Sequence, residues 1–317
     1  MSGSKVFIVV WLVTSVAYAQ SACTQSVPVS VMEIDTGAVL TELHASDFHI
    51  TLGGEPVTVV SAERDFGPRS VVLVLDVNRR ITSSPDNWDS ESQVARIILR
   101  GIRKKSRISM VAFAKDGMRR IGFNSGQKGI FDWLASVDAN RGQLDASPKP
   151  VGVLDAIQTA VGMLPTGEYG STIILITPGV TYKSQIGWQA VWYELARKAV
   201  RVFAFHPQIF AGGTVPEDPL WITNSTGGLQ FQWPDIEVDN VRLLFDTPPS
   251  YSYYIDRLVL GQILAPIRLE IRVDSPPPPG AEWKVEILNS KNGKKRGGLY
   301  VVFPYHIPYC HEPSVRP

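Results

Sequence analysis

Hydrophobic and polar residues follow two different patterns along this chain, and the pattern changes at a Gly-Pro pair. Between Val27 and Val60, apolar residues alternate with polar or small ones, and turn-forming residues interrupt the alternation twice. A period of two is typical of strands that bury one face. After Gly67 and Pro68, short continuous apolar runs are separated by stretches of helical periodicity. The pattern predicts a small antiparallel β unit followed by an α/β region.

The α/β region contains runs that predict buried strands, namely Val71–Leu75, Ile108–Phe113, Thr172–Thr177 and Val200–Phe205. Between these runs, hydrophobic residues fall on single helical faces, as in 94–102, 151–161 and 188–195. Parallel neighbours need crossover connections, and helices usually supply them. We therefore expect an α/β fold with a doubly wound, mostly parallel sheet of the Rossmann-like type between about Arg69 and Thr247, flanked by antiparallel β segments.

The alternating pattern of apolar and polar residues returns beyond Pro249, in Leu269–Val273, Trp283–Ile287 and Leu299–Phe303. These runs predict either a second β unit or strands that complete the first. The expected organisation is a signal peptide at 1–19, an N-terminal β unit at 20–67 and an α/β domain at 68–248. A C-terminal β segment at 249–305 and a tail at 306–317 follow.

The N-terminus has the features of a secretory signal peptide. Lys5 precedes an apolar stretch from Val6 to Val16, and the small residues Ala17 and Ala19 form a cleavage site. No later apolar stretch reaches the roughly 18 residues needed to span a membrane. The sequence predicts an exported protein without a membrane span, either periplasmic or secreted.

Cys23 and Cys310 lie near the two ends of the mature chain. An oxidising compartment permits a disulfide between them, and domain termini are often close together. Lipidation of Cys23 is the alternative, but the residues before it lack the aliphatic position of a lipoprotein cleavage box. The disulfide stays open at this point.

Composition narrows the set of partners. The chain has 317 residues, 44% of them hydrophobic, and a formal net charge of +1. A balanced charge gives no reason to expect a nucleic acid partner, and the basic run from Arg100 to Arg107 is explained by cations at a helix C-terminus. No glycine-rich phosphate loop, zinc-protease motif or nucleophile elbow is present.

Asp76 is the most informative single residue, because a buried strand carries it to the edge where ligands of open α/β sheets bind. Its surroundings resemble the acidobacterial VWFA-related family, exported proteins with a leading β unit and a von Willebrand factor type A-like domain. The phrases that carry the resemblance are 27–60, PRSVVLVLDV at 68–77, VLDAIQTAV at 153–161, STIILITPG at 171–179 and NSTGGLQF at 224–231.

In metal-binding type A domains an Asp-x-Ser-x-Ser motif, a threonine and a later aspartate surround Mg²⁺. Of these positions the chain keeps the first aspartate, Asp76. The others are occupied by Asn78, Arg80, Val151 and Pro178. A guanidinium about 5 Å from a divalent cation would be repelled by roughly 7 kcal/mol at an effective dielectric near 20. The resemblance therefore implies a degenerate site without its usual Mg²⁺ and no catalytic residue.

Three roles remain open for Asp76: capping a nearby helix or loop, pairing with Arg79 or Arg80, or holding a weak metal. Asp155 resembles a position of the VWFA-related family that orients a loop. Acidic residues at 86, 89 and 91 could bind Ca²⁺, although they also suit the start of a helix.

Other groups of residues are explained more simply by structure than by ligand binding. His306, Cys310 and His311 offer zinc donors but lack a fourth ligand. A group of aromatic residues suggests either a glycan or peptide platform or, from the alternation of Tyr251 and Tyr253, a half-buried strand. The group consists of Tyr251, Tyr253 and Tyr254 with Trp221, Phe231 and Trp233. Asn224-Ser225-Thr226 matches the acceptor sequence for N-glycosylation, but it is better explained as a turn.

These observations favour a non-enzymatic binding or scaffolding protein that contacts a protein partner without bridging Mg²⁺. A metal-dependent adhesion module with a relocated site is the first alternative. An enzyme of the cell envelope is the second, but no nucleophile, base and orienting group can be named together.

Overall fold

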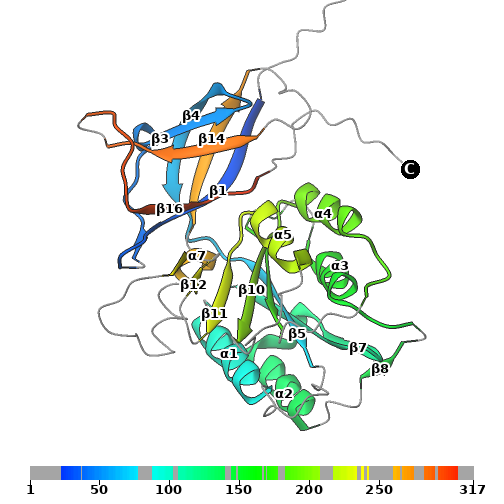
Figure 1. Ribbon diagram of the computed structural model, residues 1–317. Helices are drawn as coiled ribbons and strands as arrows, with labels where there is room; N and C mark the ends of the chain where they lie inside the picture. The colour runs from blue at the N-terminus through cyan, green and yellow to red at the C-terminus, as the bar shows by residue number, and fades with distance from the viewer. Residues whose placement is uncertain are drawn as a thin grey trace, which may run out of the picture.

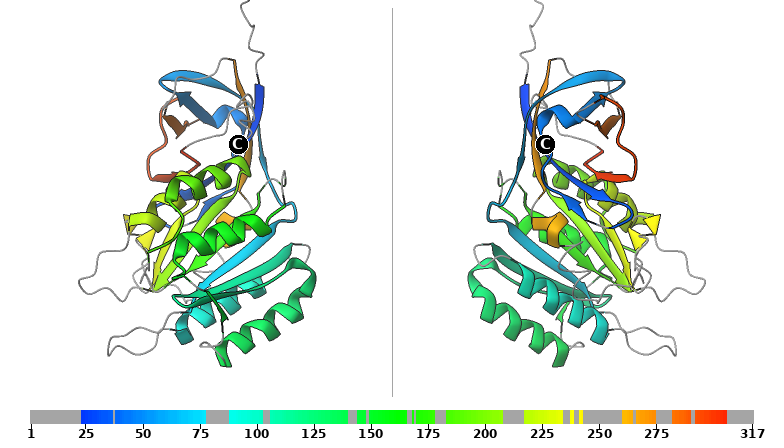
Figure 2. Two further views of the ribbon diagram at one scale, coloured as in Figure 1. Left: turned by 90° about the vertical axis from the view of Figure 1, so that its right-hand side faces the viewer. Right: turned by 90° about the vertical axis from the view of Figure 1, so that its left-hand side faces the viewer.

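The structure is a computed structural model in which two β sheets lie at opposite ends of the molecule (Figures 1 and 2). The described residues are 23–36, 38–77, 88–102, 106–139, 144–147, 149–165, 168, 170–177, 183–207, 217–233, 237–238, 241–242, 260–264, 266–274, 282–289 and 292–305. Within them, no helix has the length and apolar character needed to cross a membrane.

One sheet is antiparallel, seven-stranded and curled, with the order β15-β3-β4-β14-β1-β16 and β2 beside β1. Its strands are β1 Cys23–Glu33, β2 Val39–Leu40, β3 Phe48–Leu52, β4 Glu55–Arg64, β14 Ile267–Val273, β15 Trp283–Ile287 and β16 Leu299–Val302. A short 3-10 helix, η1 Ala45–Asp47, precedes β3. The alternation seen in the sequence is real, since β14 buries every second residue.

The two alternating segments of the sequence build this sheet together. β14 lies between β1 and β4, with Val27 opposite Leu269 on one side and Ala62 opposite Leu269 on the other. β15 pairs with β3 in the same way. Strands from the C-terminal segment therefore complete the first β unit, which was one of the two arrangements left open by the sequence.

The other sheet is mixed and nine-stranded, in the order β13-β12-β11-β10-β9-β5-β6-β7-β8. Its strands are β5 Ser70–Asp76, β6 Arg107–Ala114, β7 Gly117–Ile121, β8 Asp145–Ala146, β9 Thr172–Ile176, β10 Arg201–Pro207, β11 Gln230–Trp233, β12 Glu237–Val238 and β13 Val241–Arg242. The central strand β5 is buried along its whole length.

The expectation of a doubly wound, mostly parallel, Rossmann-like sheet is wrong. Among the described strands of the nine-stranded sheet, four pairings are parallel and four are antiparallel. The antiparallel sheet is a second, curled half-barrel and not a flanking segment. One cause is the two-residue turn between Ala114 and Gly117, which returns β7 beside β6 where a crossover was expected.

Helices cover both faces of the mixed sheet (Figure 1). They are α1 Trp88–Gly101, α2 Gly126–Ala139, α3 Val153–Met163, α4 Trp188–Arg197, α5 Glu217–Ser225 and α7 Leu260–Leu264, with η2 Phe123–Ser125 before α2. Val71, Leu73 and Leu75 of β5 pack in the core with α1 and α2. Val72 and Val74 point the other way, into the core with α3 and α4.

The two sheets are joined by buried contacts. Met32 of β1 and Val302 of β16 belong to the same core as the α1–α2 side of the mixed sheet. Arg201, at the start of β10, is 1% exposed and donates from Nε to Gly227 O at 2.8 Å and from an Nη to Ser30 Oγ at 3.2 Å. The guanidinium therefore ties the mixed sheet to β1.

Candidate functional site

The carboxyl ends of β5 and β9 bring Asp76 and Thr177 together. The two strands are parallel, with Leu75 opposite Ile176, so the next residues of both meet at the same edge. Thr177 Oγ1 donates a hydrogen bond to Asp76 Oδ2 at 3.0 Å. Their exposed fractions are 1% for Asp76 and 3% for Thr177. A buried carboxylate needs such donors, because desolvation without them costs several kcal/mol.

Sequence reasoning missed this role of Thr177. The sequence pattern placed Thr177 at the end of a strand. Pro178, the next residue, was the one compared with the later aspartate of a type A metal site. The available signal was that two apolar runs, both predicted to be buried strands, are followed directly by a carboxylate and a hydroxyl respectively. Arg79 and Arg80 lie outside the described residues, so their pairing with Asp76 stays a prediction.

Val151 stands on the same rim, just before α3. Its side chain is 6% exposed, and its backbone N–H donates to Lys115 O at 2.9 Å. A second backbone bond joins Val77 N–H to Phe113 O at 2.9 Å. These bonds fix the loops after β5 and β6 and before α3. Asn78, Arg80 and Pro178, the other degenerate positions, lie outside the described residues.

Asp155 holds a loop in place at the start of α3. Its Oδ2 accepts the backbone N–H of Gly152 at 2.9 Å, which caps the helix. The same carboxylate accepts the backbone N–H groups of Gln185 and Ile186 at 3.0 and 3.2 Å. In return, Ser184 Oγ accepts the N–H of Leu154 at 3.0 Å. Residues 184–186 are thus fixed to the helix N-terminus by reciprocal bonds.

Of the positions that the resemblance assigns to a type A metal site, the structure describes Asp76 and Val151, and the loss of Mg²⁺ stays a prediction. Asp76 is the single carboxylate of the expected set, and Val151 carries no oxygen in its side chain. Among the described residues, no cluster of three histidine, cysteine or acidic side chains could hold a metal. Mg²⁺ is usually bound through one or two carboxylates with near-octahedral geometry. The described part of this edge consists of one carboxylate bonded to Thr177 and the apolar side chain of Val151.

Other sequence candidates are placed only in part. Glu91 is buried in the first turn of α1, while Asp86 and the side chain of Asp89 lie outside the described residues. Phe231 is buried in β11 and belongs to the core. Residues 224–226 end α5 and enter a turn. The signal peptide, Tyr251, Tyr253 and Tyr254, and the tail with His306, Cys310 and His311 lie outside the described residues, as does the side chain of Cys23.

No protein-family model matches this chain, and no curated protein matches it. Several solved structures do. The conserved hypothetical protein BatB from Bacteroides thetaiotaomicron is 15% identical and covers 61% of this chain and 98% of its own, with a TM-score of 0.43. An aerotolerance-related membrane protein from Bacteroides fragilis is 15% identical over 54% of this chain and 93% of its own, with a TM-score of 0.40.

Proximal thread matrix protein 1 from the mussel byssus is 14% identical and covers 54% of this chain and 43% of its own, again with a TM-score of 0.40. The two Bacteroides proteins are von Willebrand factor type A-like in fold. Likeness at this level identifies neither the family of this chain nor its function.

Proposed function

We propose that this chain is an exported, non-enzymatic binding or scaffolding protein, which contacts a protein partner at the edge where β5 and β9 end, above the buried Asp76, Thr177 and Val151, without a bridging Mg²⁺. The observation that carries the proposal is the hydrogen bond from Thr177 to the buried Asp76 carboxylate, together with the buried Val151 at the position where the resemblance to type A domains implies a threonine.

A fixed rim supports binding to another protein. Backbone bonds from Val77 and Val151 and the clamp around Asp155 hold the loops of this edge before any partner arrives. Loops that are ordered in advance lose less conformational entropy on binding, which leaves more of the contact energy for affinity. An enzyme would need a nucleophile, a base and an orienting group together, and the pair of Asp76 and Thr177 accounts for at most two of these roles.

Metal independence is tested by titration calorimetry with Mg²⁺, Mn²⁺ and Ca²⁺ after exhaustive chelation. The parent chain should give no binding heat. The Asp76→Ala variant should give none either, while losing stability because Thr177 is left without its acceptor. Binding of Mg²⁺ by the parent at micromolar concentrations, removed by Asp76→Ala, would contradict the proposal and favour the metal-dependent adhesion module.

Partner binding is tested by site-specific photo-crosslinking. The exposed Lys149, two residues before Val151, is replaced by p-benzoylphenylalanine, and the exposed Lys128 of α2 is the matched control. In cells of the source organism broken in EDTA, the probe at 149 should give a discrete crosslinked protein that the probe at 128 does not. A crosslink that disappears in EDTA and returns with Mg²⁺ would defeat the proposal.

A further inference from the structure

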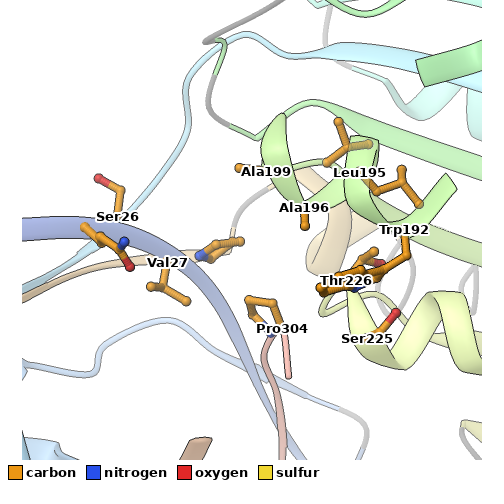
Figure 3. Close-up of a pocket in the computed structure, with 12 residues that line it drawn as sticks. Ser26, Val27, Trp192, Leu195, Ala196, Ala199, Ser225, Thr226 and Pro304 are labelled. Carbon is orange, nitrogen blue, oxygen red and sulfur yellow. The ribbon is translucent and has the colours of Figure 1, made fainter. Parts of the chain in front are cut away.

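A cavity of about 150 Å³ lies between the two sheets, away from the rim (Figure 3). β1 forms one wall with Val27 and Pro28, and α4 forms the other with Trp192 and Ala196. Pro304, just after β16, lies between the walls in the close-up. The cavity therefore exists only because the antiparallel sheet is packed beside α4.

The lining is electrically neutral. None of the described residues that line the cavity carries a charge. Its hydroxyl groups already donate elsewhere: Thr226 Oγ1 to Ile222 O at 2.8 Å, Ser225 Oγ to Ile222 O at 3.1 Å, and Ser26 Oγ to Glu270 Oε1. A charged occupant would find no counter-charge there. The lining suits an uncharged, mainly hydrocarbon group.

The size of the cavity fits one side chain. An apolar cavity of about 150 Å³ can hold a group of the size of benzene. A leucine or phenylalanine side chain is of this order. Single apolar side chains inserted into a pocket of the partner are the anchors that dominate many protein interfaces. The volume is thus that of an anchor pocket and not that of a cofactor site.

Exposed tryptophans extend the apolar surface beyond the cavity. Trp192 contacts Trp221 of α5, with ring centroids 6.4 Å apart, and Trp221 contacts Trp188 at 4.3 Å. Trp188 and Trp221 are 39% and 38% exposed. Tryptophan is enriched at the centre of protein interfaces because it supplies a large contact area at a low entropy cost. A partner seated on the cavity would also cover these rings.

A backbone feature of the cavity wall points to the same use. Ala199 has φ +51, the left-handed region, directly after α4. Its N–H donates to Ala196 O at 3.0 Å and that of Val200 to Leu195 O at 2.9 Å, which is the Schellman pattern. Glycine is usual at this position, because a Cβ there costs roughly 1 kcal/mol. The alanine methyl instead contributes to the cavity wall.

From these observations we propose that the cavity between β1 and α4 is an anchor pocket for one uncharged apolar side chain of a partner protein, with the Trp188–Trp221 surface as its continuation. This site is separate from the rim, so it stands whether or not the rim binds a partner.

The test is a two-dimensional NMR titration that follows the indole N–H of Trp192, assigned by its loss in Trp192→Phe. The probes are the N-acetyl amides of leucine, phenylalanine, lysine and glutamate. The leucine and phenylalanine amides should shift this signal and saturate with a Kd on the order of millimolar, as expected for fragments of this size. The lysine and glutamate amides should leave it unchanged.

Ala196→Phe fills the cavity from an accessible position of α4 and should abolish the shifts. Ala190→Phe adds the same ring to an exposed position of the same helix and should leave them intact. Equal shifts in both variants, or none in the parent, would overturn the proposal. So would saturable binding of n-hexane with no response to the amides, because the cavity would then be a lipid-chain site.

Discussion

At the scale of single residues, Ala199 shows how a local rule can be broken at a surface that has another use. Its left-handed backbone is strained for any residue with a Cβ, yet the helix end is otherwise regular. Asp76 is the other example. Its carboxylate is almost fully buried, and a neighbouring strand supplies the hydroxyl that makes burial tolerable.

Ala199→Gly should therefore stabilise the protein by about 1 kcal/mol, because glycine adopts this conformation without strain. The measurement is the free energy of unfolding in urea. Ala190→Gly, at an exposed helical position of α4, is the control and should destabilise by about 1 kcal/mol. The opposite signs of two identical substitutions separate backbone conformation from helix propensity; loss of stability in both would refute the explanation.

At the scale of elements, α3 and α4 stabilise each other through a helix end. Lys198 Nζ donates to Val161 O at 2.8 Å and to Leu164 O at 3.0 Å, which are carbonyls at the end of α3. An ammonium group at this point adds hydrogen bonds to carbonyls at the end of the helix, and it interacts favourably with the helix dipole.

Lys198→Met should cost about 1–2 kcal/mol of unfolding free energy, since it keeps the aliphatic stem and removes the donor. Chemical denaturation measures the loss. Lys183→Met, at an exposed position, should change stability by less than about 0.5 kcal/mol. Equal effects of both substitutions would mean that charge alone, and not the bonds to α3, is responsible.

The β15 strand carries a pH-dependent contact. The hydrogen bond from Lys295 Nζ to Glu286 Oε1, 2.9 Å long, lowers the pKa of the Glu286 carboxyl below its usual value. A lowered pKa in the folded state means that the stabilisation is present above the unfolded-state pKa and is lost as pH falls through the folded-state value.

The stability difference between the parent and Glu286→Gln should thus shrink between about pH 6 and about pH 3. It should stay below about 1 kcal/mol throughout, because the side chain is 37% exposed. Thermal unfolding across this pH range provides the check, with Glu282→Gln as the matched variant. A stability difference that grows on acidification would contradict a lowered pKa of Glu286 in the folded state.

The sequence predicted the elements with strong periodicity and missed those without it. The buried strands β5, β6, β9 and β10 lie where continuous apolar runs predicted them. β7 escaped notice because its two arginines interrupt the pattern, although the Asp116-Gly117 pair is a hairpin signal. β8, β12 and β13 have two residues each, too few for any period to appear.

The candidate site was predicted only in part. The position of Asp76 follows from the end of an apolar run, whereas the sequence placed Asp155 inside a helix and the structure places it in the first turn. The hydrogen bond between Thr177 and Asp76 depends on the register between β5 and β9. These strands lie about a hundred residues apart, and no local pattern specifies their alignment. The cavity beside Trp192 depends on how two sheets pack, and no local pattern predicts that either.

At the scale of the whole molecule, the two sheets behave as one body because buried groups connect them. Arg201 is the clearest of these, with bonds to Gly227 O and Ser30 Oγ. Gly227 has φ +71, and a Cβ there would lie 2.5 Å from Pro304 N. The turn after α5 and the chain after β16 are therefore pressed together.

Arg201→Met should destabilise the protein by about 2–4 kcal/mol, because it leaves buried acceptors at Gly227 and Ser30 without this donor. Arg197→Met, at an exposed position of α4, should cost less than about 1 kcal/mol. Differential scanning calorimetry would compare them. If Arg201→Met unfolds at the same temperature as Arg197→Met, the guanidinium does not hold the sheets together.

The position of β14 between β1 and β4 has a consequence for the order of events during synthesis. Two strands from the beginning of the chain have no neighbour in common until Ile267–Val273 has left the ribosome. Pairings between such distant segments form slowly. The antiparallel sheet can therefore close only after β14 has been synthesised, and a chain destined for export would stay open, and able to pass through a narrow channel, until that strand arrives.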